Sequence, residues 1–324
     1  MTVPSSAVTD RVPLAHLPTP VEPMPRLAAH LGMDDDALWV KRDDCTGLAG
    51  GGNKARKLEY LCAEAVTQGC DTLVTGGGRQ SNHVRMTAAA ANRLGLACTI
   101  VLAGDRPDHP TGNVVLDLVL GPDIVWAGAL DYYGTEAAIE EAASRLRAEG
   151  RRAYAVPVGG ASVTGALGYV AAADELTAQV DDVDLVVVAD GSGGTHAGLV
   201  AGLGDHAKVL GVDVGTRPDL DDQVPAKAAE VAARAGRRTP TGDVVIDHDR
   251  FGSGYGDPTD DCREALDLAG RLEGLLLDPV YSGKALAGLV AARHDGRIGR
   301  DTRVVFLHTG GLPALFAARY ATWV

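Results

Sequence analysis

The chain has 324 residues, of which 46% are hydrophobic, so it can bury one large core or two of moderate size. Its 43 acidic residues outnumber its 30 basic ones and give a formal net charge of −13, which argues against a nucleic acid or an anionic membrane as partner. The N-terminus lacks a signal-peptide pattern, and the apolar runs are too short to span a membrane. Five scattered cysteines indicate free thiols in the cytoplasm.

Short β-branched runs alternate with alanine-rich helical segments along the chain. Strands are predicted at 38–41, 72–76, 98–103, 123–127, 153–158, 184–190, 208–214, 243–246 and 303–309. Helices are predicted at 54–68, 81–94, 134–149, 162–178, 195–203, 222–236, 258–273 and 283–294. Continuous apolar runs are typical of strands that are covered on both faces. The sequence therefore predicts an α/β fold with mostly parallel sheets flanked by helices, and a polar, partly exposed stretch at 217–242.

Four predicted strand–helix junctions are rich in glycine and small hydroxyl residues. They are GGGNK (50–54), TGGGRQSNH (75–83), DGSGGTHAG (190–198) and HTGGLPALF (308–316). In parallel α/β folds, ligands bind at the carboxyl ends of the strands. We therefore expect these four turns to converge on one composite site.

The turn DGSGGTHAG is the best candidate for a phosphate cradle, because glycines allow close approach and the free amides at a helix start attract an anion. A tight turn with a helix cap is the alternative. The P-loop pattern fails because Asn53 precedes Lys54 and Ala55 replaces the hydroxyl residue. The dinucleotide fingerprint fails because His196 stands where its third glycine belongs. Pyridoxal phosphate fits these residues, since Lys54 can bind its aldehyde while a distant turn holds its phosphate.

Six segments, in order, resemble one family of enzymes. They are GGGNKARKLEYL, GGRQSNHVRMTAAAANRLGL, GSGGTHAGL, GYGDPTDDCREAL, LLLDPVYSGKALAGL and HTGGLPALF. Together they resemble the D-cysteine desulfhydrase and 1-aminocyclopropane-1-carboxylate deaminase family of pyridoxal-phosphate enzymes, from about residue 12 to residue 318. The resemblance implies the two-domain type II fold of the tryptophan synthase β chain, and a homodimer. It implies a large domain of residues 1–54 plus 166–324, and a small domain of residues 55–165.

The same resemblance implies a role for individual residues. Lys54 corresponds to the lysine that binds the cofactor covalently, and Asn53 precedes it in the cofactor site. Ser81 and Asn82 correspond to residues that hold the substrate carboxylate and the ring hydroxyl, and Ser81 also handles a proton. The residues predicted to form the phosphate cup are Ser192, Gly193, Gly194 and Thr195. Thr309 would lie beside the pyridine nitrogen, and Tyr255 and Tyr281 would act with Lys54 and Ser81 in catalysis.

Arg79, Gln80 and His83 are further candidates for substrate binding. Arg79 departs from the small or apolar residue expected before QSNH, and it either binds a second anionic group or points into solvent. His83 either reaches the substrate or makes a structural hydrogen bond. Asp190, another departure from the family, either brings negative charge near the phosphate turn or caps the helix.

The substrate is predicted from the residue after the PVY tyrosine. Ring-opening deaminases of the family carry Glu there, whereas this chain has Ser282. With Ser282 and Thr309 nearby the pyridine nitrogen would stay neutral, which favours α,β-elimination of a β-substituted amino acid. D-cysteine, giving pyruvate, ammonia and hydrogen sulfide, is the preferred substrate. The alternatives are an L-cysteate sulfo-lyase, because DDCTGLAGGGNK resembles such enzymes, a cyclopropane deaminase, and a non-catalytic cofactor-binding protein.

Several other charged residues receive a structural interpretation. Arg56 and Lys57 are expected to be surface charges of their helix, and Lys284 is expected to face solvent. His196 is expected to have no part in the phosphate cup, and His308 to end a buried strand. The spacing of His, Cys and Asp residues predicts no metal site.

Overall fold

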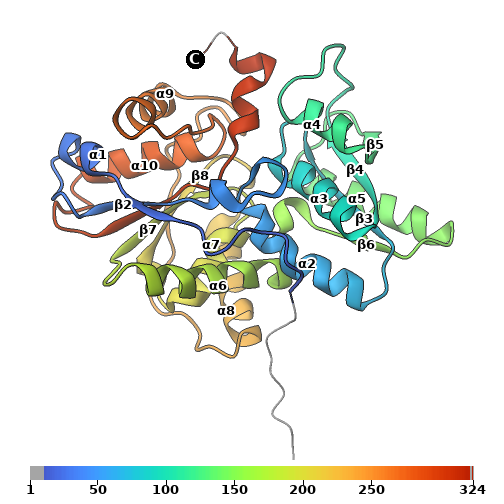
Figure 1. Cartoon of the computed structure of the whole chain (residues 1–324), viewed down its shortest axis with the longest axis horizontal. Coiled ribbons are helices and arrows are strands. Elements are labelled where there is room, and N and C mark those ends of the chain that lie inside the picture. The colour runs from blue at the N-terminus through green and yellow to red at the C-terminus, as the bar shows by residue number, and fades with distance from the viewer. Residues whose placement is uncertain (1–10, 322, 324) are drawn as a thin grey trace, which may run out of the picture.

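The computed structural model describes residues 11–321 and 323, which form two sheets flanked by helices (Figure 1). The larger sheet has the order β1-β2-β10-β7-β8-β9 and the smaller one has the order β5-β4-β3-β6. The larger sheet consists of β1 (Val21–Pro23), β2 (Leu38–Lys41), β7 (Leu185–Asp190), β8 (Val209–Asp213), β9 (Val245–Asp247) and β10 (Val304–Leu307). The smaller sheet consists of β3 (Thr72–Gly78), β4 (Ala97–Ala103), β5 (Asp123–Trp126) and β6 (Ala153–Ala155). Strands β1 and β2 pair antiparallel, and the other strand pairs are parallel.

Helices cover both faces of each sheet (Figure 1). Their bounds are α1 (Pro25–His30), α2 (Lys54–Thr67), α3 (Asn82–Leu94), α4 (Asn113–Leu120), α5 (Tyr132–Ala148), α6 (Val163–Gln179), α7 (Gly194–Leu203), α8 (Leu220–Arg234), α9 (Asp260–Leu268) and α10 (Ser282–His294). Helix α9 continues into a π turn over Ala269–Glu273. No helix of the described part of the chain has the length and apolar character needed to cross a membrane.

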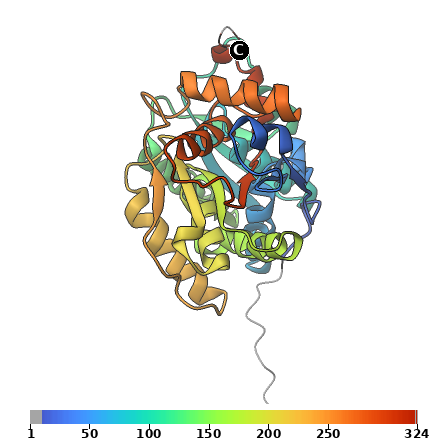
Figure 2. The same ribbon diagram turned by 90° about the vertical axis from the view of Figure 1, so that its left-hand side faces the viewer.

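Alternating side chains of each central strand build separate cores on the two faces. Val187 and Ala189 of β7 pack in one core with α1, α9 and α10. Val186 and Val188 of the same strand pack in another core with α6, α7 and α8. Figure 2 turns the larger sheet toward the viewer, with α9 and α10 above its strands and α8 below them. The smaller sheet divides in the same way between α2 and α3 on one face and α5 on the other.

The predicted α/β class with mostly parallel sheets is confirmed. All nine predicted strands and eight predicted helices are present, the strand 38–41 with its predicted bounds and the others with ends that shift by one to a few residues. The prediction missed β1, α1 and α4, because a three-residue edge strand and helices of six and eight residues carry little periodic signal. The predicted strand 153–158 ends early at Ala155, shortly before Pro157. The polar stretch 217–242 contains helix α8, whose Leu220 and Val224 are fully buried.

The division into domains stays a prediction. All four strands of the smaller sheet lie within the segment 55–165, and the other strands lie outside it. Residues 1–10, which the prediction assigns to the large domain, lie outside the described residues.

A buried ionic network joins β2, α2 and α6. The guanidinium of Arg56 makes two hydrogen bonds to Asp43, of 2.8 and 2.9 Å, and both side chains are at most 1% exposed. It also contacts Glu175 at 2.8 Å, and Glu175 in turn pairs with Lys41. The prediction that Arg56 is a surface charge is therefore wrong. The network fixes the helix that begins at Lys54.

We expect Arg56→Met to lower the free energy of unfolding by about 3–5 kcal/mol, because it leaves Asp43 buried without its cation. Urea denaturation measures this change. The matched control is Arg147→Met, which removes a pair with Glu140 that is exposed on both sides and should cost less than about 1 kcal/mol. Equal losses in the two variants would contradict the prediction.

Candidate active site

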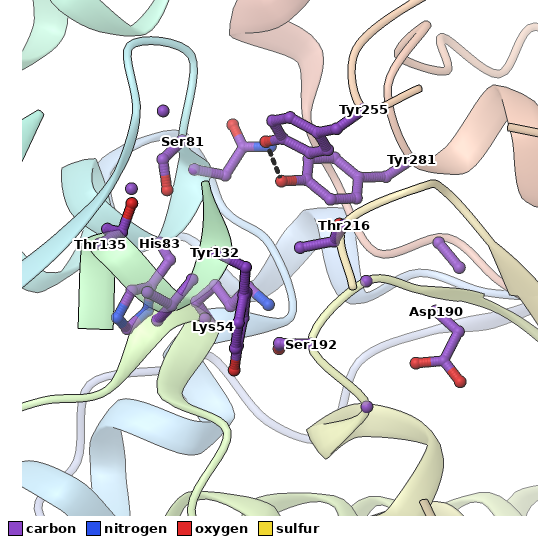
Figure 3. A pocket seen from close by; sticks show the side chains of 18 of the residues that line it. Lys54, Ser81, His83, Tyr132, Thr135, Asp190, Ser192, Thr216, Tyr255 and Tyr281 are labelled. Carbon is purple, nitrogen blue, oxygen red and sulfur yellow. Dashed lines mark hydrogen bonds between the residues drawn. The ribbon is translucent and has the colours of Figure 1, made fainter. Parts of the chain in front are cut away.

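All four glycine-bearing junctions meet at one cavity of about 340 Å³, as predicted (Figure 3). The junctions contribute Asn53, Lys54, Gly77, Gly78, Ser81, Asn82, His83, Asp190, Gly191, Ser192, Gly193, Thr195, Thr309 and Gly310. The remaining lining includes Tyr132, Thr135, Gly159, Thr216, Tyr255 and Tyr281. The cavity therefore draws on the carboxyl ends of strands from both sheets.

The loop before Lys54 can be built only with glycine at its centre. Gly51 has a φ of +77°, and a Cβ on it would lie 1.8 Å from the carbonyl oxygen of Asp44. The hydroxyl of Thr46 bonds both the amide and the carbonyl of Gly52, each at 2.8 Å. The amide of Asn53 donates to the Thr309 carbonyl at 3.0 Å. These bonds hold the loop at both ends. Lys54 follows it as the first residue of α2, and its side chain lines the cavity.

Burial lowers the pKa of Lys54 to about 8, while the negative charge of Asp190 acts in the opposite direction. About a tenth of the amine is therefore unprotonated at pH 7, far more than for an ordinary lysine. An unprotonated amine can act as a nucleophile toward a carbonyl group and as a base.

Lys57 lies one helical turn beyond Lys54 and is fully buried, so the prediction of a surface charge is wrong. Its Nζ donates to the carbonyl of Gly159 at 3.2 Å, and a Cβ on Gly194 would lie 3.0 Å from the same nitrogen. Burial, together with the nearby charge of Lys54, holds the pKa of Lys57 well below its usual value. The i,i+3 spacing, which places both lysines on one face of α2, is the signal that could have identified it.

The turn after β7 fits a phosphate group. Gly193 has a φ of +82° and provides no side-chain cap, so the amides that open α7 are not occupied by a capping side chain. The Nδ2 of Asn53 donates to the hydroxyl of Thr195 at 3.1 Å, which ties this turn to the lysine loop. The close approach of Lys57 to Gly194 adds a primary amine beside the same amides.

Asp190 lines the cavity and does not cap α7. Its Oδ2 lies 2.7 Å from the Nδ1 of His196, and both side chains are buried. Asp190 therefore brings a buried carboxylate, paired with a histidine, beside the phosphate turn.

The turn that opens α3 places three predicted residues at the cavity. Ser81 caps the helix by accepting from the amide of Val84, and Asn82 and His83 follow it. The Nε2 of His83 lies 2.9 Å from the hydroxyl of Thr75. Burial and the two nearby lysines hold the pKa of His83 well below its usual value, so the imidazole is neutral.

Arg79 and Gln80 do not reach this cavity. Both line a second hollow of about 440 Å³, which adjoins the first at Gly78, Ala103, Leu130 and Tyr255. Arg79 is exposed and donates to the Asp105 carbonyl at 3.4 Å, and Gln80 bonds the amide of Asn113. The structure thus separates these two residues from the other predicted substrate ligands.

The hydroxyl groups of Tyr255 and Tyr281 are hydrogen-bonded to each other at the cavity wall (Figure 3). Burial and the neighbouring Tyr255 raise the pKa of Tyr281 well above its usual value, so this phenol keeps its proton. The loop that carries Tyr255 is held by Lys284, whose Nζ donates to the carbonyls of Phe251 (2.9 Å) and Gly254 (3.3 Å). Lys284 is fully buried, so the prediction that it faces solvent is wrong.

Thr309 lines the cavity, but Ser282 is not among the lining residues. The Ser282 side chain is fully buried, and its hydroxyl donates to Asp278 at 2.7 Å. The place of Ser282 beside the cofactor ring stays a prediction, and the preference for α,β-elimination needs support from other residues of the cavity.

Sequence reasoning missed the wall formed by the start of α5. Tyr132 lines the cavity (Figure 3). The guanidinium of Arg217 lies 4.8 Å from the centre of its ring. Thr135 follows one turn later. No motif marks these two residues in the sequence.

Comparison with known proteins defines the class of protein to which this site belongs. The model of the family "Pyridoxal-phosphate dependent enzyme" matches residues 12–310. The chain belongs to this family, which confirms the predicted cofactor. Lys54, Lys57 and the phosphate turn fit the aldehyde and the phosphate of that cofactor.

Individual relatives narrow the class. The chain is 43% identical to a D-cysteine desulfhydrase of Klebsiella pneumoniae over 320 residues, and 44% identical to one of Salmonella typhi over 323 residues, with 95% of each chain covered. A solved structure described as an ACC deaminase homologue has a TM-score of 0.88 and 37% identity, and covers 96% of this chain and 94% of its own. A threonine deaminase of Solanum lycopersicum, with 17% identity, a TM-score of 0.66 and coverage of 90% and 79%, shares the fold. The predicted family and the type II fold are confirmed.

We expect Lys54 of the cofactor-free protein to react with acetic anhydride with a pH midpoint near 8, well below the value of about 10.4 for an ordinary lysine. Competitive labelling followed by peptide mass spectrometry measures the midpoint. In Asp190→Asn the midpoint should fall, because the variant removes a negative charge that stabilises the ammonium. An unchanged or raised midpoint in this variant would refute the electrostatic assignment.

Proposed function

We propose that this chain is a pyridoxal-phosphate lyase that catalyses α,β-elimination of D-cysteine to pyruvate, ammonia and hydrogen sulfide. The proposal rests on one observation. The amine of Lys54, whose pKa is lowered, lines the same cavity as the turn that is expected to bind the phosphate. The two relatives named D-cysteine desulfhydrase, similar over 95% of the chain, support this substrate.

The proposed roles follow from position in the cavity. When bound, the cofactor supplies the electron sink for carbanion chemistry. Lys54 removes the proton from Cα, and Ser81 and Asn82 hold the substrate carboxylate. Lys57 and the opening amides of α7 would hold the phosphate, and Thr309 would lie at the pyridine ring.

The hydrogen-bonded pair of Tyr255 and Tyr281 is proposed to assist the leaving group. Because Tyr281 keeps its proton at neutral pH, the pair can donate to the departing sulfur. A hydrosulfide needs only such a donor. The sulfonate of L-cysteate would be bound best by an arginine, whose guanidinium can donate two parallel hydrogen bonds to it. The described residues that line the cavity include no arginine. This observation favours D-cysteine over L-cysteate.

We expect the purified enzyme to release pyruvate and sulfide from D-cysteine faster than it releases sulfite from L-cysteate or 2-oxobutyrate from 1-aminocyclopropane-1-carboxylate. Lys54→Ala should lower kcat by about 10³-fold or more, because it removes a positioned base. The control Lys208→Ala, at an exposed lysine, should keep full activity. Dominant production of sulfite or 2-oxobutyrate would reject D-cysteine as the substrate, and full activity of Lys54→Ala would reject the assigned base.

We further propose that the chain forms a homodimer and works in the cytoplasm. Apolar side chains are exposed on two segments, with Val115, Leu118 and Val119 on α4 and Phe316 on the C-terminal turn Leu312–Phe316. The amide of Ala318 donates to the Thr111 hydroxyl, and a Cβ on Gly112 would lie 2.9 Å from the Pro313 carbonyl oxygen, so the start of α4 lies beside this turn. An exposed apolar patch of this kind is typical of an interface between subunits.

The five free cysteines support the proposed location in the reducing cytoplasm.

We expect light scattering to give a mass of about twice the 33.5 kDa of the chain. The double variant Val119→Glu, Phe316→Glu should shift the protein to the monomer, because burying two carboxylates in an apolar contact is unfavourable. Leu276→Glu, at an apolar residue that is 60% exposed outside these segments, is the control and should stay dimeric. A wild-type monomer would exclude the proposed assembly.

A further inference from the structure

The side-chain amide of Asn82 is held in one orientation by two buried donors. Its Oδ1 accepts a hydrogen bond from the Nη1 of Arg85 at 2.8 Å and another from the Nδ2 of Asn113 at 3.0 Å. Arg85 and Asn113 are 0% exposed, and Asn82 lines the cavity. An amide oxygen has two acceptor positions, and both are occupied here. The NH2 group of Asn82 is therefore the polar group left for the cavity.

Arg85 connects this amide to the loop that delivers Lys54. It lies one turn after Asn82 on α3, and its Nη2 donates to the carbonyl of Gly51 at 3.1 Å. Its Nη1 also bonds the Oδ1 of Asn113, the first residue of α4. Although burial lowers the pKa of Arg85 to about 10, the guanidinium stays charged at neutral pH. One cation thus ties together the glycine loop and the starts of α3 and α4.

Asn113 is itself held in place by Gln80. The amide of Asn113 donates to the Gln80 Oε1 at 2.8 Å, and its Nδ2 donates to the Gln80 carbonyl at 2.9 Å. These bonds fix the orientation of the Asn113 side-chain amide, so that its Nδ2 faces Asn82 and its Oδ1 faces Arg85. Gln80, expected from the sequence to bind substrate, belongs to this support in the structure.

We propose that Arg85 and Asn113 are positioning residues that present the NH2 group of Asn82 as a donor to an anionic oxygen of the bound ligand. The oxygen belongs either to the substrate carboxylate or to the ring oxygen of the cofactor. A flipped amide would turn its own oxygen toward that anion and repel it. This inference rests on the proposed function for the identity of the substrate, but the cofactor can be tested without turnover.

The test is Asn113→Asp, which keeps the size of the side chain and an acceptor for Arg85. It replaces the donor that faces the Asn82 oxygen with a second acceptor, so the Asn82 amide should turn its NH2 group away from the cavity. If the substrate carboxylate is the target, KM for D-cysteine should rise about tenfold or more while kcat falls less than about threefold. If the ring oxygen is the target, the Kd for pyridoxal phosphate should rise about tenfold and the absorption band should shift.

The matched control is Asn92→Asp, at a residue whose Nδ2 also joins α3 to α4 by donating to the Leu120 carbonyl at 2.8 Å, far from Asn82 in the chain. It should leave KM, kcat and cofactor binding unchanged.

Should Asn113→Asp not fold, Arg85→Lys is measured in the same way, because an ammonium cannot span the Asn82, Asn113 and Gly51 oxygens together. A folded variant with unchanged KM, Kd and spectrum overturns the inference. A wild-type enzyme that does not turn over D-cysteine rejects the proposed substrate, and the cofactor titration then decides the positioning role alone.

Discussion

Two lysines lie on one face of α2, Lys57 fully buried and Lys54 half-buried at the cavity, and neither forms a salt bridge within the described residues. Burial of an ammonium without a counter-charge is costly, so such groups lose protons or wait for an anion. Both outcomes serve a site that binds a phosphorylated aldehyde. The amine with a lowered pKa can attack the aldehyde, and the second amine, beside the opening amides of α7, can take up a proton and pair with the phosphate.

The rest of the fold makes this arrangement possible. The network around Arg56 anchors α2 from the side of the larger sheet, while Arg85 holds the glycine loop from the side of the smaller one. Asn53 connects the lysine loop to the phosphate turn through Thr195. The cavity therefore lies where the two sheets meet, and each sheet supplies part of the site.

Much of this architecture could be predicted from the sequence, because its signals are local. Continuous apolar runs gave the parallel strands, and the glycine-rich junctions gave the four turns that line the cavity. Buried charges could not be predicted in this way. Arg56, Lys57 and Lys284 were expected at the surface because charged helical residues usually face water. Their burial depends on partners distant in sequence, such as Asp43, Gly159 and the carbonyl of Phe251.

We propose that the amine of Lys54 binds the cofactor aldehyde in the cavity between the sheets. The most direct measurement is borohydride reduction of the yellow protein, followed by digestion and mass spectrometry of the peptides. We predict one reduced pyridoxyl phosphate group per chain, located on Lys54. Attachment to another lysine, or a protein that takes up no pyridoxal phosphate, would contradict the account.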